Sequence, residues 1–128
     1  MAENELETSV GSQERSILSA GSVVVEEIRI EPAKEGSKAK VVRLQCKHPE
    51  KKESIILSNL KIKKTQGNNE TISKETLWWN LDDENKIRKG SNVAILLSFY
   101  KKDKLVDLVG SKLETEHDAN KYLCIKAY

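Results

Sequence analysis

Aromatic residues, cysteine, proline and histidine are all scarce in this chain of 128 residues. Aromatic residues make up 5% of it, and there are only two each of Cys, Pro and His. No segment approaches the roughly 18 consecutive apolar residues that a membrane-spanning helix requires. A chain of this length can bury roughly two-thirds of its unfolded surface, so it needs neither a disulfide nor a metal ion to fold. We expect one soluble domain without membrane contact.

The residues that most often carry catalysis are also few. His48 precedes Pro49 in a basic turn and His117 lies in an acidic stretch, so we expect both to be solvated loop residues. Neither has a cysteine or a pair of carboxylates at ligand spacing, which argues against a zinc site. The six glycines stand singly, so the chain has no glycine-rich phosphate loop. We predict a non-catalytic binding protein with no cofactor, metal or small-molecule substrate.

The first residues lack the basic start and apolar middle of a secretory signal, and they hold four glutamates. We therefore expect a disordered N-terminal arm over residues 1–18 and a single β domain over residues 19–128. A chain that stays in a reducing compartment, nuclear or cytoplasmic, keeps Cys46 and Cys124 as free thiols. Because the chain stops inside an apolar segment, it is also compatible with one domain of a longer protein.

Positive charge is concentrated in two parts of the chain. The net charge of the whole chain is only +2, but 21 basic and 16 acidic residues remain once residues 1–18 are set aside. Residues 38–64 hold nine basic and two acidic residues, and residues 86–104 hold six basic residues and one acidic residue. The β domain therefore has two basic regions that the overall net charge conceals.

Alternating and β-branched segments predict seven or eight short strands. Residues 22–30 form the first, and residues 39–47 and 54–63 are predicted to pair as a hairpin. The most apolar segment, 93–100, is predicted as a central strand that forms a second hairpin with 105–109.

The polar segment 110–120 is predicted as a loop, and residues 122–128 as the last strand. Residues 72–81 fit a strand, with a short helix as the alternative; a helix there favours a barrel and a strand favours a sandwich. The predicted fold is all-β: either a small Greek-key barrel similar to the oligonucleotide-binding (OB) fold or a β-sandwich, with at most one short helix.

Lysines beside aromatic residues suggest a surface for nucleic acid. Two basic turns resemble the loops with which OB barrels clamp their ligand. Ammonium groups neutralise phosphates and exposed rings stack on bases, although lysines on a sheet edge also serve to prevent aggregation. The predicted phosphate contacts are Lys47, Lys51, Lys61, Lys63, Lys101, Lys102 and Lys104, and the predicted base contacts are Trp78 and Tyr100.

Two functions fit these patterns. The first is an OB-like domain that binds single-stranded nucleic acid or serves as a subunit of a nucleic-acid-binding complex. The alternative is a β-sandwich for protein–protein contacts, such as an oligomeric module of the nucleoplasmin type of histone chaperone. In that alternative Trp78 and the apolar strand 93–100 mark the interface. Both a monomer and an oligomer fit the sequence.

Overall fold

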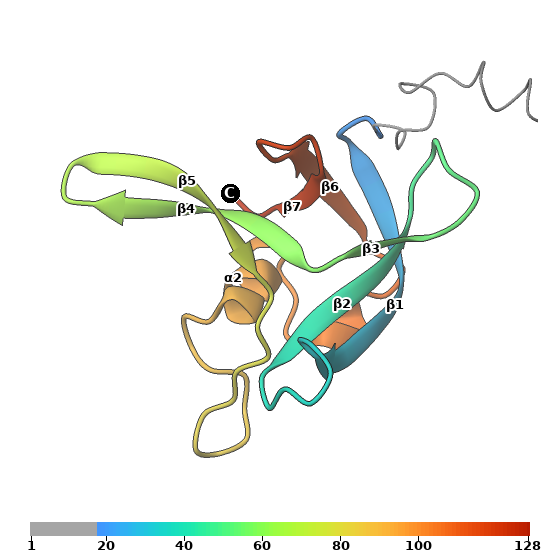
Figure 1. Ribbon diagram of the computed structural model, residues 1–128. Coiled ribbons are helices and arrows are strands. Elements are labelled where there is room, and N and C mark those ends of the chain that lie inside the picture. The colour runs from blue at the N-terminus through green and yellow to red at the C-terminus, as the bar shows by residue number, and fades with distance from the viewer. Residues whose placement is uncertain (1–17) are drawn as a thin grey trace, which may run out of the picture.

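The computed structural model describes residues 18–128, which form one curled, barrel-like sheet of seven strands with one α-helix (Figure 1). The predicted all-β fold is thus confirmed, while the predicted arm lies outside the described residues except for Leu18. In chain order the elements are β1 (Ser22–Pro32), β2 (Lys40–Lys47), β3 (Ile55–Leu57), β4 (Asn59–Gln66), β5 (Asn69–Thr76), α2 (Asn92–Phe99), the 3₁₀ helix η2 (Leu105–Leu108), β6 (Lys112–His117) and β7 (Leu123–Lys126).

The strand order explains why the sheet curls. It runs β3-β2-β1-β6-β7-β4-β5, and every neighbouring pair is antiparallel except β4 and β7, which are parallel. Only Ser58 separates β3 from β4, although these two strands pair with β2 and β7 respectively. Covalent continuity therefore brings the two sides of the sheet together, and the sheet bends back on itself.

The first two strands follow the alternation of the sequence. Val23 and Val25 of β1 are buried, and a register shift between Val25 and Glu27 marks a bulge that bends the strand. In β2 the inward residues are Val42, Leu44 and Cys46, as the alternation predicts. The predicted hairpin is confirmed only for Ile55–Leu57 of β3, which pairs with β2, because residues 59–63 belong to β4 and pair with β5 and β7 instead.

The predicted central strand 93–100 is wrong, because this segment forms helix α2. Its buried residues are Val93, Leu96 and Leu97, at the i, i+3, i+4 spacing of a helix face. The hydroxyl of Ser91 accepts a hydrogen bond from the Ala94 N–H at 3.2 Å and caps the helix. Since residues 105–108 form η2, the predicted hairpin between 93–100 and 105–109 does not exist.

Two other segments also differ from expectation. Residues 72–76 lie in a strand, but β5 begins at Asn69 because Gly67, with a φ of 60°, allows a two-residue hairpin loop. The β4–β5 hairpin projects from the sheet and extends one edge of it, so a strand here does not indicate a sandwich (Figure 1). The predicted loop 110–120 contains β6, in which Leu113 and Thr115 are buried.

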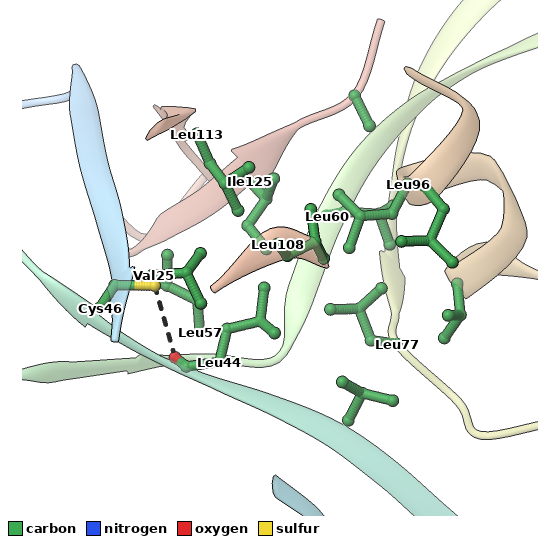
Figure 2. Close-up of a cluster of buried hydrophobic side chains, with 14 of the residues drawn as sticks. Val25, Leu44, Cys46, Leu57, Leu60, Leu77, Leu96, Leu108, Leu113 and Ile125 are labelled. Atoms are coloured by element: carbon green, nitrogen blue, oxygen red, sulfur yellow. Dashed lines mark hydrogen bonds between the residues drawn. The ribbon is translucent and has the colours of Figure 1, made fainter. Parts of the chain in front are cut away.

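One hydrophobic cluster fills the interior (Figure 2). Side chains from the strands and from both helices meet there, among them Leu44, Leu60, Leu96 and Leu108, each fully buried. Cys46 donates its thiol hydrogen to the Leu44 carbonyl, with a sulfur–oxygen distance of 3.6 Å. Burial raises the pKa of this thiol to about 12. Both cysteines are free, as predicted, and buried.

Within residues 18–128, no helix has the length and apolar character needed to cross a membrane.

Candidate functional site

A groove runs between β3, the end of β5 and the loop that joins β6 to β7. We name it the β3–β7 groove. It has a volume of about 430 Å³ and is lined by Leu18, Lys51, Ile55, Ile56, Leu57, Ser58, Asn59, Lys74, Lys121, Tyr122 and Leu123. Three lysines from three separate segments therefore face one space, together with an aromatic residue.

The β6–β7 loop is held in one shape by Asp118. Its Oδ1 accepts hydrogen bonds from the backbone N–H of Asn120 (2.8 Å) and of Tyr122 (2.9 Å). Lys121 takes a left-handed backbone conformation, with a φ of 66°, that completes this tight turn. As a result Tyr122 stands at the groove with 53% of its surface exposed.

The other carboxylate oxygen of Asp118 binds Lys74 of β5 at 2.7 Å. This hydrogen bond, together with the backbone N–H groups, lowers the pKa of Asp118 to about 2. The same contact raises the pKa of Lys74. Much of the charge of Lys74 is therefore neutralised, and Lys74 fixes the loop rather than adding a full positive charge to the groove.

The positive field of the groove comes instead from Lys51 and Lys121. Within residues 18–128, no carboxylate lies within 4.0 Å of the ammonium group of either residue. Lys47 stabilises the turn that carries Lys51, because its ammonium group donates hydrogen bonds to the backbone carbonyls of Lys51 (2.8 Å) and Lys52 (2.7 Å). Exposed Ile56, beside them, gives the groove an apolar wall.

Of the nine residues predicted to meet nucleic acid, only Lys51 lines this groove. Lys61 donates to the His117 carbonyl at 2.6 Å and lies 3.8 Å from Glu116, so it ties β4 to β6. Lys63 pairs with Glu70 across the β4–β5 hairpin at 3.3 Å. Both ammonium groups thus have partners within the protein.

Lysines 101, 102 and 104 lie apart from the groove. They lie in the segment between α2 and η2, which contributes no residue to the lining of the groove. Lys101 and Lys102 line a separate shallow depression against α2. The structure therefore divides the predicted lysines among several surfaces.

The two predicted aromatic residues differ in exposure. Trp78 is 39% exposed and lies with Lys38 and Lys40 at a recess of about 380 Å³, while Trp79 packs against the core. Tyr100 is half-buried, and its hydroxyl donates to the Lys126 carbonyl at 2.6 Å and accepts from the Glu114 N–H at 2.9 Å. Tyr100 therefore anchors the end of α2 to β6 and β7.

Both histidines hold the start of the described chain. The Nε2 of His48 lies 2.9 Å from the Ser19 carbonyl, and that of His117 lies 2.6 Å from the Leu18 carbonyl. Because a carbonyl only accepts, each Nε2 carries the donated proton. His48 is only 2% exposed, so its predicted solvation is wrong. These contacts place Leu18 at the groove.

The groups that line the β3–β7 groove determine what it can bind. Among residues 18–128, no group of three or more His, Cys, Asp or Glu side chains is placed to hold a metal ion. The groove offers cations, one exposed ring and an apolar wall, which suits an anionic ligand with flat apolar groups. No family model matches this chain, and neither the curated proteins nor the solved structures contain a match.

Proposed function

We propose that this chain is a non-catalytic OB-like module that binds single-stranded nucleic acid at the β3–β7 groove, alone or as a subunit of a larger complex. The observation that carries the proposal is the convergence of Lys51, Lys121 and exposed Tyr122 at one groove. Ammonium groups are the partners of phosphates, and an exposed ring offers a stacking surface to any base.

The connectivity supports an OB-like reading. If β3 and β4 are counted as one strand broken at Ser58, the ring order is β1, β2, β3/β4, β7, β6 and back to β1. This is a five-stranded Greek-key barrel, with α2 between its third and fourth strands and the β5 hairpin as an addition. OB barrels bind oligonucleotides with the loop between their last two strands. Here that loop carries Lys121 and Tyr122.

The outer face of β1 and β2 is a poorer candidate. Its arginines are already paired, Arg29 with Glu27 at 3.4 Å and Arg43 with Glu31 at 3.9 Å. Such a surface has little net charge to attract a polyanion. We therefore place the main phosphate contacts at the groove, and the Trp78 recess, with Lys38 and Lys40, is a second contact for longer ligands.

Fluorescence anisotropy with a labelled oligo-dT tests the proposal. We expect the full chain to bind at low salt, with an affinity that falls steeply as salt increases. The double variant Lys51→Glu/Lys121→Glu should bind at least about tenfold more weakly and with a smaller salt slope. Tyr122→Ala should also weaken binding, by roughly 1–3 kcal/mol.

A control is Lys86→Glu, which makes half the charge change of the double variant, at a residue whose side chain is 76% exposed and pairs with Glu84. We expect this variant to bind nearly as well as the wild-type chain. Absence of binding by the wild-type chain at low salt would refute the proposal. An equal loss in Lys86→Glu would mean that the groove is not the binding site.

The alternative function, a sandwich for protein–protein contacts, loses one of its two supports. It depended partly on residues 93–100 as an apolar surface, but α2 buries Val93, Leu96 and Leu97. Light scattering distinguishes the two functions, because a chaperone-type module would form a stable oligomer and the proposed domain would not.

A further inference from the structure

We propose that the second half of β1 is a docking edge for an extended segment of another protein, which adds to the sheet as a strand. The surface consists of the β1 edge at Glu27–Pro32 and the apolar groove between this edge and η2; we name it the β1 edge. It shares no residue with the β3–β7 groove. A partner docked there would leave the proposed nucleic-acid site open.

The first observation is an edge that lacks a partner strand. β1 pairs with β2 as far as Pro32, but it pairs with β6 only over Ser22–Val24. Val25 then exchanges hydrogen bonds with Gly110 and Ser111. Within residues 18–128, the backbone of Glu27–Glu31 has no hydrogen bonds other than those to β2. In an antiparallel strand such an edge presents N–H and C=O groups at alternate residues.

The second observation is an apolar groove beside that edge. It has a volume of about 440 Å³ and is lined by Ile28, Ile30, Leu105, Val106 and Val109, together with Glu26 and Glu27. Ile30 is 40% exposed, Val109 46% and Val106 68%. Exposed apolar residues that gather at one groove mark an interaction surface more often than residues scattered singly.

Together these features fit an added strand. Backbone hydrogen bonds to the edge provide affinity, and every second side chain of the added segment enters the apolar groove. Among the described residues, those with charge that line the groove are Glu26 and Glu27, of which Glu27 shares its charge with Arg29 at 3.4 Å. The partner segment should therefore alternate apolar residues with lysine or arginine.

A second copy of this chain is the competing occupant of the edge. If two β1 edges paired antiparallel about Arg29, each Arg29 would face the other and Glu27 would face Glu31, and like charges directly opposite one another destabilise a strand pair. Pairing about Ile28 or Ile30 would instead set Arg29 opposite Glu27 or Glu31. The carboxylates at the groove make a basic segment the proposed occupant, and self-association is the outcome that the test below separates from it.

A synthetic peptide that alternates Lys with Val is a suitable probe for NMR titration of the isotope-labelled full chain. We expect the amides of residues 27–31 to shift and to gain at least tenfold protection from hydrogen exchange. The bound peptide should be extended. A peptide that alternates Glu with Val should bind at least tenfold more weakly.

Val106→Ser should weaken binding of the basic peptide about tenfold, because it removes an apolar side chain from the groove without adding charge. Ile72→Ser, at an exposed apolar residue of β5, should leave binding unchanged. The proposal is overturned by no binding up to about 1 mM peptide, by shifts centred elsewhere, by a helical bound peptide, or by dimerisation of the chain through β1.

Discussion

Asp118 and Lys74 form an ion pair of 2.7 Å that joins the β6–β7 loop to β5 at the β3–β7 groove. The same carboxylate accepts the N–H groups of Asn120 and Tyr122, so one side chain fixes both walls of the groove. The side chain of Asp118 is only 6% exposed, whereas that of Lys74 is 43% exposed. Asp118 thus organises the loop that presents Tyr122.

Acid titration should show this role directly. The pKa of Asp118 in the folded protein is about 2, below the value of about 4 for an unperturbed aspartate. Its contribution to stability is therefore fully present above pH about 4 and is lost as the pH falls through about 2. We expect the carboxyl carbon of Asp118 to titrate by NMR with a midpoint near 2. A midpoint near 4 would mean that the ion pair does not form in solution.

Asp118→Asn should increase the affinity for oligonucleotides. The substituted amide keeps an oxygen that can accept the N–H groups of Asn120 and Tyr122, but it no longer neutralises Lys74. The groove therefore gains one positive charge, and binding at low salt should become severalfold tighter. Anisotropy measures the effect, with Asp83→Asn, at an exposed residue away from the groove, as the charge-matched control. Unchanged binding by Asp118→Asn would show that Lys74 is not near the ligand.

Ser91→Ala should destabilise the protein by about 1 kcal/mol, because it removes the N-cap of α2. Ser98→Ala, at an exposed residue within the same helix, should change stability little. Urea denaturation of the two variants gives the comparison. Equal stability of both variants would argue that residues 92–99 are not helical in solution.

His48→Ala should cost roughly 2–3 kcal/mol, because the buried ring bonds both the Ser19 carbonyl and the Glu50 N–H. His117→Ala should cost less, since its ring is only half-buried and has one such contact. Chemical denaturation at neutral pH measures both. A neutral effect of His48→Ala would contradict the buried position of this ring.

Strand alternation predicted the elements in which it is the main signal. Val42, Leu44 and Cys46 of β2 are inward, as the period of two requires. The same period misled at Val93–Phe99, where apolar residues fill both a strand face and a helix face. In the sequence, only the serine at position 91, a good N-cap residue, indicates a helix rather than a strand for this segment.

The sequence did not predict β6, because Leu113 is the only large apolar residue of this strand and the buried Thr115 is a polar residue type. The residues of the β3–β7 groove were harder to predict from the sequence than the strands. Lys74 and Lys121 are 47 positions apart in the sequence, and only the sheet order brings β5 beside β7 through β4. The turn residues from Asp118 to Lys121 could have indicated that Tyr122 is at a loop end.

The central claim is that nucleic acid occupies the β3–β7 groove, and an NMR titration of the full chain with a short oligo-dT at low salt tests it most directly. We predict that the amides of residues 118–123 and of Lys51 shift together, with saturation, while those of Lys101, Lys102 and Lys104 stay in place. No shift in the groove, or shifts centred on the lysines after α2, would contradict the account.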